Sequence, residues 1–264
     1  MLAQVISGAK EFYFQSALLK TLILFITGIL TSMFGTLVGG AAFITIPVMT
    51  ALGIPLTIAI SANAFSNIGL NFGGFRRFTR VNLIHYRIGF FLAFFAFLGS
   101  IFGSYLVLHT PPIYIKSIFL LALLSTFFSL FIRPKKGIVQ NTSQSIGKTN
   151  WLLGGTLAVL LGAYSGFLGA GVGTLYTYGL VFIFHHNFLE STATKKIPGL
   201  AQAIGASLIF LINGKIDYTV ALPLFIGMYL GAEIGAYYGV KFGNTFVRLL
   251  LISITVILLI KFLF

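Results

Sequence analysis

The chain contains no cysteine, and acidic residues are almost absent from it. Only 4 of its 264 residues are Asp or Glu, against 17 Lys or Arg, so the formal net charge is +13. Without cysteine, disulfides, thiolate metal sites and cysteine nucleophiles are all excluded. Charged residues make up 8% of the chain, whereas a soluble domain carries roughly a quarter. A water-soluble fold is therefore excluded as well.

The chain is rich in apolar residues. Hydrophobic residues make up 58% of it, Phe occurs 29 times, and the mean hydropathy is +1.01. This composition is the opposite of that of a disordered chain. The basic residues stand in small groups between apolar stretches, as in membrane-protein loops, so they do not indicate a nucleic-acid partner. We expect an all-α polytopic protein of the cell membrane, with residues 1–264 forming a single transmembrane domain in contact with lipid.

Several apolar segments are long enough to cross a bilayer, which takes about 20 helical residues. The segments that reach this length are 57–75, 88–108, 112–132, 219–240 and 245–264. The shorter apolar segments are 17–34, 41–56, 151–167, 172–184 and 197–212. Glycine clusters divide the shorter segments at Gly35, Gly39 and Gly40 and again at Gly166, Gly169, Gly171 and Gly173. Short, glycine-interrupted segments in both halves indicate broken or re-entrant helices around a transporter's binding site.

The two halves of the chain match in register. A shift of 131 positions carries Gly35 to Gly166 and Asn71 to Gln202, and one further residue aligns 98–105 with 230–237. We predict two repeats, 17–132 and 151–264, joined by a polar cytoplasmic linker, 133–150. Each repeat has five apolar segments and a glycine-broken or re-entrant first hairpin. An odd number of crossings per repeat would invert the second repeat relative to the first, and the basic residues favour both termini outside.

These features together resemble the sulfite exporter TauE/SafE family of membrane proteins. The motifs are a glycine-rich first hairpin from Gly35 to Gly40 followed by Pro47, and its counterpart from Gly166 to Gly173. Small polar helix starts follow at 61–63 and 191–194, and then the pairs Gly99/Gly103 and Gly231/Gly235. The sequence departs from the family pattern at Ala41-Ala42, where more glycine is usual, and at Tyr178, which stands where the first repeat has Pro47. The resemblance implies export or uptake of small anions, especially sulfite, organosulfonates and related sulfur compounds.

A candidate anion site follows from the residues themselves. A helix that starts at a glycine break has free backbone N–H groups and the positive end of its dipole, both of which favour an anion. Asn63, Asn67 and Asn71 recur every fourth residue, so they form one stripe that should face the protein interior. The predicted substrate-binding residues are Gly39, Gly40, Asn63, Asn67, Asn71, Gly171, Gly173, Thr194 and Gln202. The alternative is structural: close helix packing by the glycines, favoured for Gly99, Gly103, Gly231 and Gly235, and interhelical hydrogen bonds by the amides.

Three charged residues stand at apolar positions. Glu233 lies inside a long apolar segment, where a carboxylate that is neutralised by burial could carry a proton. We predict a proton-coupling role for it, with a static ion pair to Lys195 or Lys196 as the alternative. The two lysines, at an expected helix break, could attract the anion or could instead extend to lipid headgroups.

No other motif carries recognisable chemistry. His185 and His186 with Glu190 lack metal-ligand spacing, so a polar helix end is favoured over a metal site. No phosphate loop and no nucleophile beside a base occur, so we expect no cofactor, no metal and no catalytic residue. The function predicted from the sequence is secondary transport of a small anion by alternating access of two repeats. A passive anion channel is the alternative, and an intramembrane enzyme is less favoured.

Overall fold

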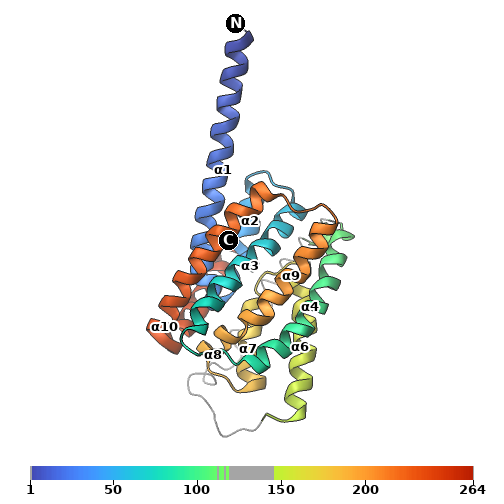
Figure 1. The fold of residues 1–264 in the computed structure, drawn as a ribbon, viewed down its shortest axis with the longest axis vertical. Helices are drawn as coiled ribbons and strands as arrows, with labels where there is room; N and C mark the ends of the chain where they lie inside the picture. The colour runs from blue at the N-terminus through green and yellow to red at the C-terminus, as the bar shows by residue number, and fades with distance from the viewer. Residues whose placement is uncertain (1, 112, 116, 119–145, 264) are drawn as a thin grey trace.

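Every element of the described chain is a helix. The structure is a computed structural model that describes residues 2–111, 113–115, 117–118 and 146–263. The helices are α1 Leu2–Val38, α2 Ala42–Ala51, α3 Leu56–Thr79, α4 Tyr86–Leu108, α6 Lys148–Phe167, α7 Val172–Phe184, α8 Phe188–Thr194, α9 Lys196–Ile212 and α10 Tyr218–Leu263 (Figure 1). Within α10 the backbone is not helical at Gly243, where φ is 74° and ψ is −166°, so this element consists of two helices joined at a kink.

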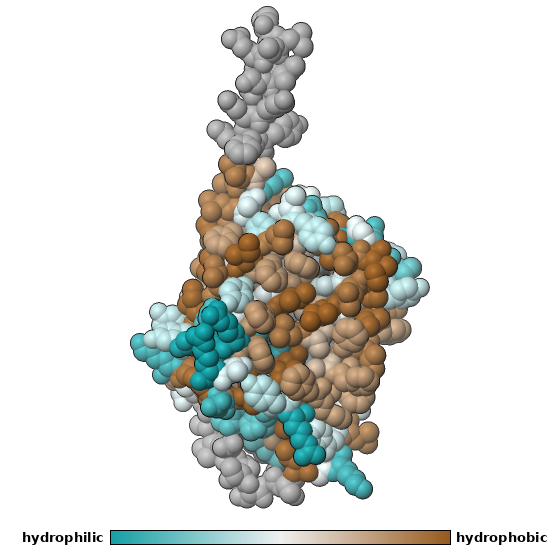
Figure 2. Space-filling model, viewed as in Figure 1, coloured by the Kyte–Doolittle hydropathy of each residue, from teal (hydrophilic) through white to brown (hydrophobic). Residues whose placement is uncertain are grey.

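The molecule is a multi-pass membrane protein. Four helical stretches of the described chain are long and apolar enough to cross a bilayer: Ala17–Val38, Tyr86–Leu108, Phe188–Ile212 and Tyr218–Gly243. Figure 2 shows apolar side chains over most of the middle of the face drawn, with hydrophilic side chains towards its lower edge. The short helices α2 and α7 have 10 and 13 residues. At about 1.5 Å of rise per residue they are too short to cross a core of roughly 30 Å.

Helices from the two halves of the chain are interleaved. The first long helix, α1, packs on α10, and α6 packs on α4. In the same way α3 packs on α10, α9 packs on α4, and α3 and α9 pack on each other. Glycines allow these close approaches, because a Cβ on Gly103 would collide with Ala163 of α6 and one on Gly235 would collide with Met33 of α1. The same holds for Gly99 and Gly231, so the packing role expected for these four glycines is confirmed.

In the first half the helix break lies a few residues beyond the expected position, whereas in the second half the expected ends at 167 and 184 and the expected start at 172 are confirmed. Helix α1 continues through Gly35 to Val38, and the chain breaks at Gly39 and Gly40, whose φ angles are 92° and 83°. Helix α6 contains Gly166, where the missing Cβ allows close contact with Ser100 of α4, and it ends at Phe167 as expected. The prediction that helical segments end at 34 was therefore wrong in its boundary, although the glycine cluster does divide the segment.

Three further expectations concern segment boundaries. The expected segment 41–56 ends as a helix at Ala51, and α3 begins at Leu56. A break does occur at Lys195, which separates α8 from α9. Most of the expected crossing 112–132, and residues 133–145 of the expected linker, lie outside the described residues.

Candidate functional site

A cavity of about 60 Å³ lies where the helix breaks of the two halves meet. It is bounded by the end of α1, the starts of α2 and α7, one side of α3, and the junction of α8 with α9. A buried water needs about 10–15 Å³ of such space, so the cavity has room for a few waters or a small oxyanion. The predicted site residues in its wall are Gly39, Gly40, Asn63, Asn67, Asn71, Gly173, Lys195, Lys196 and Gln202.

Two helix starts share one wall of this cavity. The start of α2 contributes Ala42 and the start of α7 contributes Val172 and Gly173. The two breaks touch each other, because a Cβ on Gly39 would lie 2.7 Å from the Cα of Gly173. First-turn amides have no acceptor inside their own helix, and the helix dipole places partial positive charge beside them. This wall therefore presents an environment that favours an anion.

The asparagine stripe of α3 faces the cavity as the spacing predicts. The side-chain amides of Asn67 and Asn71 each donate to the carbonyl four residues earlier, at 2.9 and 2.8 Å. Oδ1 of Asn63 accepts from Thr45 Oγ1 at 2.7 Å. Because an amide nitrogen carries two protons, one N–H of Asn67 and one of Asn71 stay available. Across the cavity, Oε1 of Gln202 is buried without a partner, and the amide rotated by 180° would present two donors there.

Two consecutive lysines are buried at the junction of α8 with α9. Lys195 is 4% exposed and Lys196 is 1% exposed. Nζ of Lys195 donates to three acceptors: Leu37 O at 3.0 Å, Gly173 O at 3.1 Å and Thr177 Oγ1 at 2.8 Å. Lys196 has no hydrogen bond and no ion pair to any described residue, and its stem packs over Gly74 of α3. Both lysines therefore line the cavity, and they do not extend to a lipid surface.

No described carboxylate lies in the wall of the cavity beside these lysines. Glu190 pairs with His85 at 3.8 Å, and Asp217 accepts from the amide of Thr219 at the start of α10. Glu233 pairs with Arg76 of α3 at 3.5 Å, and its side chain is 28% exposed. The alternative considered for Glu233, an ion pair with Lys195 or Lys196, is therefore wrong. The partner lies on the neighbouring helix α3, against which α10 packs.

Two other predicted site residues are absent from the cavity wall. Gly171 forms the turn before α7, where its φ of 79° requires glycine. The hydroxyl of Thr194 accepts from the backbone amide of His85 at 3.1 Å. Conversely, the wall includes Gly199 and Tyr176, which sequence reasoning did not select. Gly199 sits against the amide of Asn71, and only its place one turn before Gln202 on α9 could have indicated it.

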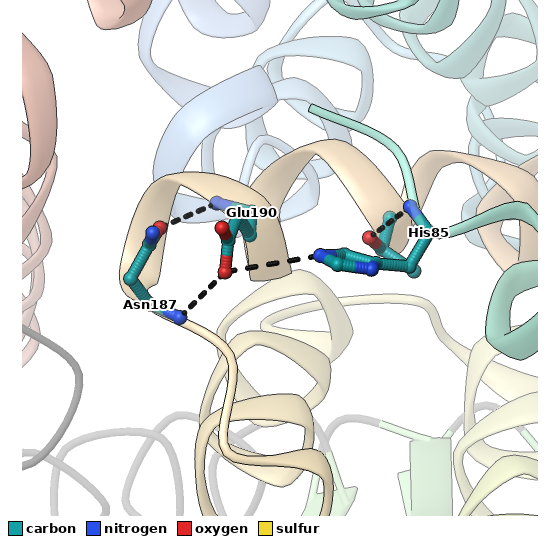
Figure 3. Close-up of polar contacts among 4 residues, drawn as sticks. His85, Asn187 and Glu190 are labelled. Carbon is teal, nitrogen blue, oxygen red and sulfur yellow. Dashed lines mark hydrogen bonds and ion pairs between the residues drawn. The ribbon is translucent and has the colours of Figure 1, made fainter. Parts of the chain in front are cut away.

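A polar cluster ties the loop before α4 to the start of α8 (Figure 3). Asn187 caps α8 by accepting from the amide of Glu190 at 2.8 Å, and the Glu190 carboxylate accepts from the Asn187 amide at 3.1 Å. The expected helix end is therefore confirmed, and no group of three potential metal ligands occurs among the described residues. His85 joins this cluster through its ion pair with Glu190, and its ring stacks on that of His186 at 4.0 Å. Burial lowers the pKa of His186 to about 4, and the neighbouring His85 acts in the same direction.

Comparison with known proteins identifies the family of this chain. The sequence profile described as "Sulfite exporter TauE/SafE" matches residues 24–262. The chain belongs to the TauE/SafE sulfite exporter family. No solved structure matches the chain significantly.

The curated relatives of this TauE/SafE chain are described as probable membrane transporter proteins. A "Probable membrane transporter protein" of Haemophilus influenzae is 26% identical over 227 residues, covering 86% of this chain and 88% of the relative. One from a Sinorhizobium species is 27% identical over 242 residues, 91% of each chain. One from Bacillus subtilis is 28% identical over 223 residues, 80% of this chain and 85% of the relative. These names point to a membrane transporter, and the family name implies a small anion as its cargo.

Proposed function

We propose that the chain is a secondary transporter that moves a small anion, sulfite or an organosulfonate, through the cavity between its two halves. The observation that carries this proposal is Lys196. Its side chain is 1% exposed, it lines the cavity, and it has no partner in the described part of the chain. A buried charge is costly unless it is paired. An anion in the cavity would supply the missing partner.

The neutral groups around Lys196 suit an oxyanion that must bind and then leave. The amides of Asn67 and Asn71 each retain one N–H, and the starts of α2 and α7 add backbone donors. Such donors can hold sulfite or sulfonate oxygens, which offer several acceptor positions. No covalent or metal chemistry is needed for this role.

Alternating access of two inverted repeats is the proposed mechanism. The helix contacts support it, since exchanging α1 with α6, α3 with α9, and α4 with the first part of α10 maps the observed contacts onto one another. In such transporters a substrate site lies at the repeat interface, formed by broken helices. The cavity meets this description, because its walls come from both halves and from the breaks at Gly39 and Lys195.

Proton coupling through Glu233 is a separate part of the proposal. The carboxylate lies on α10 beside Arg76 and does not line the cavity. Protonation of Glu233 would remove one charge from this pair, and with it an attraction between α10 and α3. A proton could in this way bias the packing of two helices that surround the site without touching the anion.

Flux measurements in proteoliposomes test the proposal. Vesicles containing the protein should take up sulfite or a short organosulfonate with saturable kinetics, and unlabelled anion on the opposite side should accelerate exchange. Conduction without saturation and without counterflow would identify a passive anion channel instead. Flux equal to that of empty vesicles across a panel of small anions would refute transport altogether.

A further inference from the structure

The geometry points to Lys195 as a positioning residue: its three hydrogen bonds hold the open end of α1 against α7 and so fix the width of the cavity, while Lys196 is the lysine left to contact the anion. The part that concerns the anion rests on the proposed function. The part that concerns the cavity wall depends only on contacts within the chain.

The donors of Lys195 are fully used by the protein. An ammonium group has three protons, and Nζ has three acceptors at 2.8–3.1 Å. One acceptor, Leu37 O, lies in the last turn of α1, and the other two, Gly173 O and Thr177 Oγ1, lie on α7. A lysine so engaged must lose a hydrogen bond before it can donate to a substrate. Its location between the two helix breaks therefore favours a structural link over direct binding.

The end of α1 needs such a link. The last carbonyls of a helix have no amide partner inside the helix, and Gly39 and Gly40 turn the chain away before the helix can continue. Side chains from the second half supply the missing donors. Thr174 donates to Val38 O at 2.9 Å, and Thr192 joins Lys195 at Leu37 O at 3.2 Å. The last two carbonyls of α1 are thus capped from the other repeat, whereas Gly35 O accepts from the backbone amide of Gly39 at 2.8 Å.

The corresponding position of the first repeat has no such link. The shift of 131 positions relates Lys195 to Ala64 and Thr174 to Phe43, neither of which has a side-chain donor. Lys195 therefore belongs to one side of the cavity only. The link that Lys195 makes between α1 and α7 is therefore not a consequence of the repeat symmetry.

The absence of cysteine from the chain makes a direct test possible. We would introduce Ala42→Cys as the only cysteine, since Ala42 lines the cavity and is 2% exposed, and measure its rate of modification by an uncharged, water-soluble thiol reagent. Asn213→Cys, in the exposed loop before α10, serves as the matched reporter outside the cavity. Lys195→Met should raise the modification rate at position 42 by about fivefold or more and leave the rate at position 213 unchanged. Lys215→Met, at an exposed lysine outside the cavity wall, should change neither rate.

Two milder substitutions test the same hydrogen bond in case Lys195→Met does not fold. Thr177→Val removes one acceptor of Lys195, and Thr177→Ser keeps it. We expect Thr177→Val to raise the rate at position 42 by a smaller factor than Lys195→Met, and Thr177→Ser to restore the parent rate. A change in side-chain size alone would not raise the modification rate for valine and restore the parent rate for serine.

The outcomes separate the inference from the proposed function. An unchanged rate at position 42 in both Lys195→Met and Thr177→Val overturns the positioning role. If Lys195→Met also abolishes sulfite binding while that rate stays unchanged, Lys195 is itself an anion ligand and only the inference fails. If the rate rises as expected but no variant, including the parent, binds any tested anion, the positioning role stands and the proposed function fails.

Discussion

Gly39 and Gly173, one at the end of α1 and one at the start of α7, meet backbone to backbone beside the cavity. A Cβ on Gly173 would lie 2.8 Å from the Cα of Gly39, and one on Gly39 would lie 2.7 Å from the Cα of Gly173. Real Cβ atoms are not found at such distances from backbone. The contact therefore requires glycine at both positions. It also joins the helix break in one half of the molecule to the helix break in the other.

Replacement of Gly39 by alanine should be more damaging than replacement of Gly40. Both residues have positive φ, so both variants lose roughly 1–2 kcal/mol from the left-handed backbone. Only Gly39→Ala also collides with backbone, because a Cβ on Gly40 would meet nothing closer than the Phe43 ring at 3.3 Å. We expect a clearly lower unfolding midpoint in detergent for Gly39→Ala than for Gly40→Ala. Equal midpoints would show that the Gly39–Gly173 contact is not close in the folded protein.

Lys196→Met should abolish anion binding and leave the fold intact. The substitution keeps the apolar stem that packs over Gly74 and removes the unpaired charge. We expect affinity for sulfite to fall at least about tenfold, equivalent to about 1.4 kcal/mol, and thermal stability without anion to stay equal or to rise. The readout is the shift in unfolding midpoint on adding anion. Lys215→Met, at an exposed lysine, is the matched control and should bind as the parent does.

Glu233→Gln should remove the dependence of flux on a proton gradient without weakening anion binding. Glutamine keeps the size of the side chain but cannot titrate, and the position does not line the cavity. Measurements of flux at fixed anion gradient and varied external pH would show the effect. The control is Asp217→Asn, which neutralises the acid at the start of α10 and keeps the oxygen that accepts from Thr219. If flux through Glu233→Gln still depends on the proton gradient, Glu233 has no coupling role and forms only a static ion pair with Arg76.

Acidification should destabilise the protein through His186. Its folded-state pKa of about 4 lies below the ordinary value of 6.5, so the unfolded chain binds a proton more readily. Stability is therefore fully present above pH 6.5 and is lost as the pH falls towards 4, by about 3 kcal/mol at most. The groups that face this ring are His85, His185 and Glu190. A detergent unfolding series across this range would measure the loss.

His186→Phe isolates this effect. Phenylalanine keeps an aromatic ring beside His85 and Phe184 but has no proton to gain. The fall in unfolding midpoint between pH 6.5 and 4 should be smaller than in the parent. The exposed residue His109 provides the comparison, and His109→Gln should follow the parent curve. A His186→Phe curve that coincides with the parent curve would assign the pH response to other groups.

Local sequence signals predicted the elements of the site well. The four-residue spacing of Asn63, Asn67 and Asn71 depends only on helix periodicity, and all three face the cavity. The glycine clusters marked both breaks, because a left-handed backbone favours glycine wherever it occurs. Exact ends were harder to predict. At Gly35 and Gly166 the glycine serves close packing, which a single sequence does not distinguish from a break.

Pairings between distant segments could not be predicted in the same way. Glu233 lies beside Arg76 because α10 packs on α3, and nothing near Glu233 in the sequence indicates this. The acceptors of Lys195 are mostly backbone carbonyls, which become available only where a helix ends and which have no sequence signature. His85 ties the loop before α4 to α8, and nothing near His85 in the sequence indicates these partners.

The packing of α1 on α10 sets an order of events during synthesis. Helix α1 leaves the ribosome first, but the helix that covers it starts at Tyr218 and is among the last to be made. At about 5–20 residues per second, the intervening chain takes on the order of ten seconds or more to translate. During most of that interval Leu37 O and Val38 O lack their final side-chain partners, since Thr174, Thr192 and Lys195 are made only shortly before Tyr218. Any chain truncated before Tyr218 therefore lacks the helix that packs on α1, although it can already contain the residues that donate to Leu37 O and Val38 O.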